Sequence, residues 1–433
     1  MINRYEVPGI SAIWTEDERW RRLLLVEVAL LEALEESHWI PSGCVAAFQG
    51  VKVNSARIRE IEKHTRHDVV AFCNSISEQV DSKYSRFFHY GVTSSDILDT
   101  ALALQIRDSL RVVSESIREI IATLEGIIIH SSDILALGRS HGVAAEPMIF
   151  AQKFFSAQTE FIRRLHDVEH LIDHEITGQL SGAVGNYSIL SPEIEVLALT
   201  KIGLQAEPVS TQVVPRDRIA KVVSIGALLS CAVERLATEI RHLSRSEVGE
   251  VSEGFGQGQT GSSTMPHKRN PVSSENLCGI ARLIRSHINP ALENTILWHE
   301  RDISHSSVER MFLPDHFGLL VYSLQRLNAT LKELVINKDR IRHNLRTTPG
   351  VFSSFLLHSL LEQNACSRET IYKLVQNAAF NSNSLEEMTA WIRDEARRSS
   401  LSAELKDLSL DSLLEHYQDR FFEIRARHQA VNA

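Results

Sequence analysis

One stretch of the sequence gathers side chains that could do chemistry: residues 261–271 read GSSTMPHKRNP. Two serines, a lysine and an asparagine stand there together, and three more glycines lie just upstream. A serine hydroxyl is a poor base unless its alkoxide is stabilised, which a closing loop that excludes water and presents backbone N–H groups could do. The alternative is a flexible connector between helices, but that leaves the cluster of polar side chains unexplained.

Long helices are expected on both sides of this loop. Several segments run for more than 20 residues with few or no glycines and prolines, and their apolar residues recur every three to four positions. Long helices of this kind with short connections predict a bundle. We expect Pro290 and Pro314 to kink or break two of the helices. The expected members are residues 96–124, 147–177, 215–248, 274–298 and 302–335.

Shorter helices are expected before and after the bundle. Thr15 and Glu18 form a capping box that begins a helix ending before Pro41, and Ser367 caps a helix near the carboxyl end. No alternating strand pattern is convincing, so the sequence predicts an all-α fold. The expected domains are an N-terminal helical domain (1–94), a central long-helix bundle (95–340) with the loop at 253–271, and a C-terminal helical domain (341–433).

The composition fits a helical protein with small-molecule rather than nucleic-acid partners. The chain has 433 residues, of which 43% are hydrophobic, with 20 glycines and 11 prolines. Average usage of glycine and proline together is about 12%, so strands and turns are disfavoured. The net charge of −9 excludes a broad basic face for nucleic acid, and an anionic ligand would need a local basic pocket.

The cysteines and the N-terminus predict a cytoplasmic protein. The five cysteines are widely spaced, odd in number and form no CxxC motif, as expected of reduced thiols. The first residues, MINRYEVPGI, contain no apolar signal core. The most apolar stretch, residues 222–233, is too short to span a bilayer, so no membrane partner is expected.

The loop resembles the signature loop of the fumarase/aspartase superfamily, whose members eliminate fumarate or a relative from a succinyl group. Other segments, in order along essentially the whole chain, resemble the adenylosuccinate lyases of the shorter bacterial type. These segments are Arg4-Tyr5 with SAIWTEDERW, TRHDVVAF at 65–72, HYGVTSSD at 89–96, GRSHG at 138–142, STQ at 210–212 and WHERDISHSSVER at 298–310.

The resemblance implies an all-α lyase of purine nucleotide biosynthesis that needs no cofactor. Its substrates would be adenylosuccinate, cleaved to AMP and fumarate, and the succinyl-aminoimidazole-carboxamide ribotide, cleaved to its carboxamide ribotide and fumarate. The resemblance also implies a homotetramer in which central helices of four subunits form a joint bundle. Each active site would then draw residues from three chains.

Catalytic roles follow from the same resemblance. β-Elimination needs a base at carbon, charge stabilisation at the carboxylate and an acid at the leaving nitrogen. Ser262 would be the base, Lys268 would stabilise the dianionic intermediate, and His141 would be the acid. Glu275 would orient and charge-stabilise His141.

Substrate-binding positions carry over residue by residue. His67 and His89, which the resemblance also makes catalytic, would lie around the leaving group and phosphate. Asn270 with Lys268 would support substrate binding. The nucleotide-contacting positions are Arg4, Tyr5, Arg66, Asp68, Thr93 and Ser94. The positions around the succinyl and phosphoribosyl groups are Gln212, Arg301, Ser306 and Arg310, where arginine suits carboxylate and phosphate alike.

Two departures from the family pattern and two rival functions remain. Ser140 stands where threonine is usual before the histidine, and AEPMIF at 145–150, which we place at a helix start, replaces a commoner EPTTF. The first rival is a carboxymuconate cycloisomerase of the same superfamily, against which the arginine-rich segments argue. The second is a non-catalytic structural relative, which should have lost residues of the loop or His141.

Three histidines could be mistaken for a metal site. His166, His170 and His174 recur every four residues along one expected helix, and two histidines at that spacing can bind a metal. No cysteine or further ligand accompanies them, and the elimination needs no metal. We therefore expect a solvated or inter-subunit helix face there, and no metal.

Overall fold

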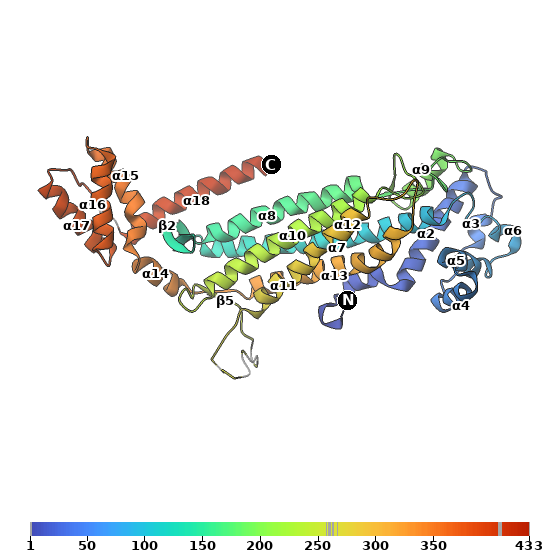
Figure 1. Ribbon diagram of the computed structural model, residues 1–433, viewed down its shortest axis with the longest axis horizontal. Helices are drawn as coiled ribbons and strands as arrows, with labels where there is room; N and C mark the ends of the chain where they lie inside the picture. Colours follow the sequence, from blue (N-terminus) through green and yellow to red (C-terminus); the bar gives the residue numbers. More distant parts are fainter. Residues whose placement is uncertain are drawn as a thin grey trace. The chain divides into compact units, whose positions relative to one another are not determined.

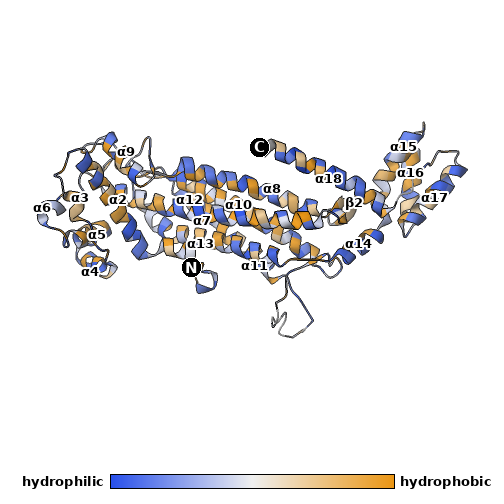
Figure 2. Ribbon diagram, turned by 180° about the vertical axis from the view of Figure 1, so that it is seen from behind, coloured by the Kyte–Doolittle hydropathy of each residue, from blue (hydrophilic) through white to orange (hydrophobic). Residues whose placement is uncertain are grey.

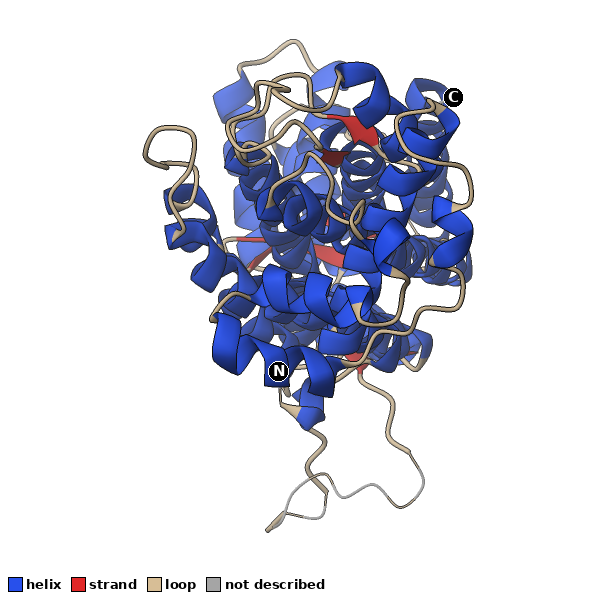
Figure 3. Ribbon diagram, turned by 90° about the vertical axis from the view of Figure 1, so that its right-hand side faces the viewer, coloured by secondary structure: helices blue, strands red, loops and turns tan. Residues whose placement is uncertain are grey.

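The computed structural model describes residues 2–256, 258, 261, 264–265, 267–405 and 409–432. Across these residues the chain is mainly helical, with six short strands paired in three two-stranded sheets (Figure 1; Figure 3). The all-α class expected from the sequence is therefore correct in its main feature. No helix of the described residues is long and apolar enough to cross a membrane.

Contacts within the chain gather in two compact units, and helices continue from one into the other. Unit 1 comprises Met1–Glu119, Phe161–Glu234 and Leu277–Arg326, and unit 2 comprises Ile120–Glu160, Arg235–Asn276 and Leu327–Ala433. The three-domain division at 94 and 340 remains a prediction.

Unit 1 begins with short elements followed by the first long helix, α2 (Glu16–Glu36). The Thr15 side chain accepts a hydrogen bond from the Glu18 backbone N–H at 3.2 Å, which confirms the predicted cap. The other early elements are η1 (Asn3–Tyr5), α1 (Pro8–Ser11), η2 (Ala12–Trp14), α3 (Cys44–Ala47), α4 (Ser55–Thr65), α5 (Asp68–Ser77) and α6 (Ser82–Ser85).

Long amphipathic helices form the middle of the chain, and hydrophobic and hydrophilic residues alternate around them in Figure 2. Their apolar faces supply most of the core, and Trp14 stacks on Phe317 of α13 with ring centroids 5.7 Å apart. The long helices are α7 (Ser94–Ser131), α8 (Ala151–His170), α10 (Arg216–Leu243), α11 (Val272–Ser286) and α13 (Ser304–Lys332), and the shorter α9 (Pro192–Lys201) and α12 (Ile288–Glu293) lie between them in the chain.

The helix predicted to begin at Pro147 begins later, because a hairpin occupies that region. Strand β1 (Leu135–Ser140) pairs antiparallel with β2 (Val143–Ile149), and Pro147 lies opposite Leu137. A proline has no N–H to donate, but a two-stranded ribbon leaves one edge of each strand unpaired. The smaller sheets pair β3 (Thr177–Gly178) with β4 (Gln205–Ala206) and β5 (Val251–Ser252) with β6 (Val335–Ile336).

Two other helices differ from their expected course. Pro314 lies inside an unbroken α13, whereas the break near Pro290 falls before it, at His287, between α11 and α12. The helix α8 passes at Leu171 into η3 (Leu171–Glu175), a single π-helical turn. The chain ends with α14 (Lys338–Arg346), η4 (Pro349–Phe352), α15 (Ser353–Gln363), α16 (Arg368–Phe380), α17 (Leu385–Arg398) and α18 (Leu410–Asn432).

Candidate active site

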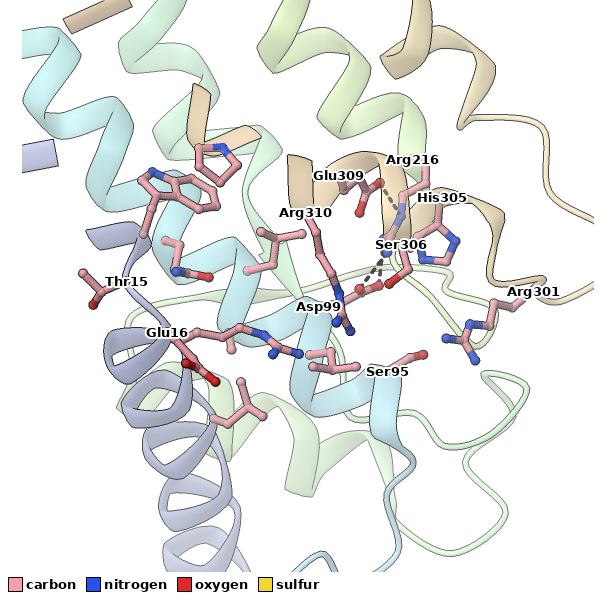
Figure 4. A pocket seen from close by; sticks show the side chains of 18 residues that line it. Thr15, Glu16, Ser95, Asp99, Arg216, Arg301, His305, Ser306, Glu309 and Arg310 are labelled. Carbon is pink, nitrogen blue, oxygen red and sulfur yellow. Dashed lines mark hydrogen bonds and ion pairs between the residues drawn. The ribbon is translucent and has the colours of Figure 1, made fainter. Parts of the chain in front are cut away.

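A cavity of about 310 Å³ in unit 1 is lined by three residues that the sequence predicts to bind substrate, Arg301, Ser306 and Arg310 (Figure 4). One face of α7 and one face of α13 form two of its walls, since their lining residues recur every three to four positions. Other lining side chains that bear on its chemistry are Arg19, Ser95, Asp99, Arg216, His305 and Glu309.

Two arginines of the cavity meet on one carboxylate oxygen. Asp68 Oδ2 lies 2.9 Å from Arg310 Nη2 and 2.9 Å from Arg19 Nη2. Burial alone would raise the pKa of Asp68, but the hydrogen bonds and charges of the two arginines outweigh it and hold that pKa below its usual range. The structure thus pairs two predicted residues, Asp68 and Arg310, directly, and it adds Arg19, which the prediction omitted, to the same carboxylate oxygen.

A buried charge network also lines the cavity. Asp99 on α7 accepts two hydrogen bonds from Arg216 on α10, and Arg216 Nε lies 3.1 Å from Glu309 Oε1 on α13. Burial raises the pKa of Glu309 to about 7 although Arg216 opposes that shift. Burial, followed by the charge of Arg216, lowers the pKa of His305 to about 4, so this imidazole is neutral at pH 7.

Gln212 and Arg301, both predicted, are in contact. Arg301 Nη1 donates to Gln212 Oε1 at 3.0 Å, and Gln212 Nε2 donates to the Ala183 carbonyl at 2.8 Å. The neighbouring backbone is held by Asp96, which accepts hydrogen bonds from the N–H groups of Ser181 and Gly182. Gln212 therefore links the cavity arginine to an anchored loop.

The predicted residues at the start of α7 are half-buried. Thr93 donates its backbone N–H to Asp96 Oδ2 at 2.8 Å, and Ser94 is the first residue of the helix. Burial raises the pKa of Asp96 to about 7, against the effect of its three backbone donors. Ser95, one residue further on, lines the cavity.

The TRHD segment joins α4 to α5, and its side chains point in different directions. Arg66 ends α4 with a positive φ of 52°, and His67 caps α5 by accepting the Val70 N–H on Nδ1 at 3.4 Å. Both side chains are exposed, whereas Asp68 turns inward to its arginines.

Two predicted groups are not among the residues that line the cavity. Arg4 and Tyr5 form η1, where the Tyr5 ring packs edge-on against Tyr322 with centroids 5.0 Å apart. His89 is held by the fully buried Glu27, with 2.6 Å between Nδ1 and Oε1.

The predicted acid, His141, lies at the tip of the β1–β2 hairpin in unit 2. His141 and Gly142 have φ values of 56° and 77°, the two left-handed residues of a tight hairpin turn. The imidazole is exposed there. The position of the imidazole is therefore set by the backbone of the turn and not by packing of the side chain.

The signature loop is described only in part, and the predicted base Ser262 lies outside the described residues. A Cβ on Gly261 would come within 2.2 Å of the Lys268 carbonyl oxygen, so these two backbone segments touch. Asn270 Nδ2 lies 3.5 Å from the Gly261 carbonyl oxygen. Glu275 is exposed in the first turn of α11.

The base of the loop is fixed by a carboxylate that the sequence analysis missed. Glu253 accepts hydrogen bonds from the backbone N–H groups of Ser273 and Ser274, and from the Ser274 hydroxyl. An acidic side chain at a helix N-terminus satisfies otherwise unpaired donors of the first turn. The signal available in the sequence was a glutamate beside the first loop glycine, with two serines opening α11.

The histidine row does not form a metal-binding group among the described residues. His166 and His170 lie on α8, but His174 falls in the π-helical turn, which changes the register of the row. Where side chains are described, the group that could hold a metal is Glu27, Cys73 and His89. Ligands of a tetrahedral ion at about 2 Å lie about 3.3 Å apart, which the 2.6 Å separation of Glu27 and His89 does not match.

Comparison with known proteins identifies the relatives of this chain. The sequence matches a family model described as "Lyase" over residues 9–285. It is 40% identical over 428 residues to the adenylosuccinate lyase of Thermotoga maritima, with 98% of this chain and 99% of the relative covered. It is 41% identical over 405 residues to the adenylosuccinate lyase of Aquifex aeolicus, with coverages of 93% and 91%.

Solved structures share the fold at lower identity. The 3-carboxy-cis,cis-muconate lactonizing enzyme of Pseudomonas putida superposes with a TM-score of 0.84 at 24% identity, covering 99% of this chain and 98% of that one. A fumarate lyase of Mesorhizobium sp. BNC1 gives a TM-score of 0.81 at 22% identity, covering 92% of both chains. At these identities the likeness shows the fold alone.

Proposed function

Because this chain belongs to the adenylosuccinate lyase family, we propose that it cleaves adenylosuccinate to AMP and fumarate by β-elimination. The same chemistry would release fumarate from the succinyl-aminoimidazole-carboxamide ribotide. The observation that carries the proposal is the cavity of unit 1, where Arg301 and Arg310 stand with Ser306. Guanidinium groups and a hydroxyl together suit a phosphate or carboxylate group.

The chemical step is assigned to residues of unit 2. Ser262 takes the proton from the carbon beside the succinyl carboxylate, and Lys268 stabilises the negative charge that develops there. His141 gives a proton to the leaving nitrogen, and Glu275 stabilises the charged imidazole. The exposed position of His141 at a turn supports this role, since it leaves the ring accessible to a substrate.

We also propose a homotetramer in the cytoplasm, with active sites shared between subunits. Large apolar side chains on four bundle helices are exposed in the single chain, and association would bury them. They are Leu228, Leu283, Leu292 and Met311. Light scattering should give about four times the single-chain mass of 48.7 kDa. An active monomer would contradict the proposal.

Sharing of sites has its own test. If His141 and Ser262 of one site come from different subunits, co-expressed His141→Ala and Ser262→Ala chains form some sites with both residues intact. Such mixed tetramers should recover activity that neither homogeneous variant has. No recovery in verified mixed tetramers would contradict shared sites.

The activity is tested by an ultraviolet assay of the purified protein with adenylosuccinate. The absorbance should change as AMP forms, and fumarate should appear in equal amount. Ser262→Ala protein, prepared in parallel, is the control for a contaminating lyase. Turnover of carboxymuconate but not of adenylosuccinate would favour the cycloisomerase, and turnover of neither would favour a non-catalytic relative.

A further inference from the structure

Both carboxylate oxygens of Glu27 contact the same residue, His89. Glu27 lies on α2 with its side chain fully buried, where an ionised carboxylate is costly unless it is paired. Its Oε1 lies 2.6 Å from His89 Nδ1, and its Oε2 accepts the His89 backbone N–H at 3.1 Å. The carboxylate therefore binds both the backbone N–H and the ring of His89.

The backbone at His89 has an unfavourable conformation that these contacts help to stabilise. Its φ is 62°, in the left-handed region that residues other than glycine seldom adopt. Gly91, two residues on, also has a positive φ of 74°, and a Cβ there would come within 2.9 Å of Ile189 and Leu190 side chains. The turn is thus fixed on one side by close packing and on the other by Glu27, which sets the direction of the ring.

The surroundings favour a protonated ring. Burial opposes the charge, but the hydrogen bond and charge of Glu27, with a smaller contribution from Asp96, raise the pKa of His89 above its ordinary value. Cys73, the third member of this cluster, has its pKa raised by burial and by Glu27, so its thiol is neutral. In the protonated ring, Nδ1–H donates to Glu27 and Nε2 carries the second N–H.

The second ring nitrogen is free for another partner. The His89 side chain is 24% exposed, and among the described residues no partner is recorded for its Nε2. An imidazolium N–H beside solvent is a strong donor to an anionic oxygen. We propose that Glu27 is a positioning residue, whose carboxylate binds the backbone N–H and Nδ1 of His89 and orients the ring so that Nε2–H donates to the phosphate of the nucleotide substrate. The identity of that ligand rests on the proposed function.

Binding of AMP, measured by calorimetry from pH 6 to 9, tests the inference with wild-type and Glu27→Gln protein. The glutamine keeps the size of the side chain but removes the charge that holds the proton on His89. At pH 6 the two dissociation constants should be within a few-fold. At pH 8 the variant should bind on the order of 10-fold more weakly, as expected for the loss of one charge-assisted hydrogen bond. Protonation of AMP itself affects both proteins and cancels in their ratio.

A matched control lies on the same helix. Glu35 also uses both oxygens structurally, accepting the N–H groups of Gly43 and Val45 at 2.9 and 2.7 Å. Glu35→Gln should keep the wild-type pH profile. A second control is His89→Gln, in whose background Glu27→Gln should cause no further loss of AMP binding. A loss that persists there would show that Glu27 acts through the fold and would overturn the inference.

Titration of the His89 ring by NMR, without any ligand, separates this inference from the proposed function. The midpoint should fall in Glu27→Gln and stay unchanged in Glu35→Gln. An unmoved midpoint overturns the inference even if the wild type cleaves adenylosuccinate. If the midpoint falls but wild-type protein does not bind AMP, the contact of Glu27 with the His89 ring is supported. The nucleotide-binding role of His89 then fails, and the proposed function fails with it.

Discussion

Arg216 and Asp99 form a two-point ion pair beside the cavity, with Nη1–Oδ2 and Nη2–Oδ1 distances of 2.7 Å each. Their side chains are only 2% and 7% exposed. The pair joins the first turn of α10 to the second turn of α7, and Arg216 also reaches Glu309 on α13. Three helices around the cavity are therefore connected through one guanidinium group.

Removing one member of this pair should destabilise the fold strongly. Asp99→Ala leaves a buried guanidinium with one of its carboxylates missing, a change that costs about 3–5 kcal/mol in comparable buried pairs. Urea unfolding of the variant and the wild type measures the difference in the free energy of unfolding. Arg57→Ala, which breaks an ion pair on the surface with Glu78, should barely move the midpoint. Equal effects of the two variants would contradict this prediction.

Arg19 should contribute to binding although the sequence analysis did not select it. It lines the cavity and shares Asp68 with Arg310, so Arg19→Gln should weaken AMP binding by roughly 10- to 100-fold, as for a charge-assisted hydrogen bond. Arg21→Gln, on the exposed face of the same helix, is the matched control and should bind normally. Calorimetry on both variants decides between a role in the cavity and a general charge effect.

The helices were largely predictable, and the hairpin was not. The capping box at Thr15 and the long segments free of glycine and proline carry local signals. The strand at 135–140 begins with a short buried apolar run, whose periodicity does not distinguish a strand from a helix. Pro147 suits a first helical position as well as a ribbon edge, so only the pairing with Leu137, a contact ten residues apart, decides between them.

The same distinction holds for the cavity. Arg301, Ser306 and Arg310 could be predicted because they stand in one motif that resembles a family. Asp99 and Arg216 could not, because their role depends on a contact between α7 and α10 that joins two residues 117 positions apart in sequence.

The two adjacent serines of the loop should differ in their effects. The family resemblance assigns the role of base to the first of them, Ser262. Ser262→Ala should lower turnover by about 10²–10⁴-fold or more while AMP still binds. Ser263→Ala should weaken binding or loop closure and keep measurable turnover. Steady-state kinetics on variants that keep the wild-type assembly state checks both, and the reverse order of effects would exchange the assignments.

Glu309 should make stability depend on pH. Its pKa is raised to about 7 in the folded protein, so its contribution to stability is complete below the ordinary value near 4.5 and is lost as the pH rises through about 7. Glu309→Gln removes this titration. Urea unfolding should therefore show that the free energy of unfolding of the variant rises relative to that of the wild type between pH 5 and pH 8. The rise should be about 1.4 kcal/mol for each pH unit that separates the folded and unfolded pKa values. A constant difference across that range would contradict the prediction.

Gly226 should be required for the packing of α10 against α13. A Cβ at this position would lie 2.2 Å from Nε2 of His316, a fully buried imidazole. Gly226→Ala should lower the free energy of unfolding by about 1–3 kcal/mol, as overpacking does. His316→Ala makes room, so adding Gly226→Ala to it should cost much less than in the wild type. Equal costs in both backgrounds would place the strain elsewhere.

At the turn of His141 and Gly142, the requirement for a backbone conformation can be separated from the proposed requirement for proton transfer. Its shape asks only for two left-handed residues, which glycine, asparagine and aspartate adopt as readily as histidine. In a library randomised at these two positions, clones with any of those residues should fold, whereas turnover should select histidine at 141. The ratio of folded to active clones would then measure the selection imposed by proton transfer, free of the selection imposed by the backbone.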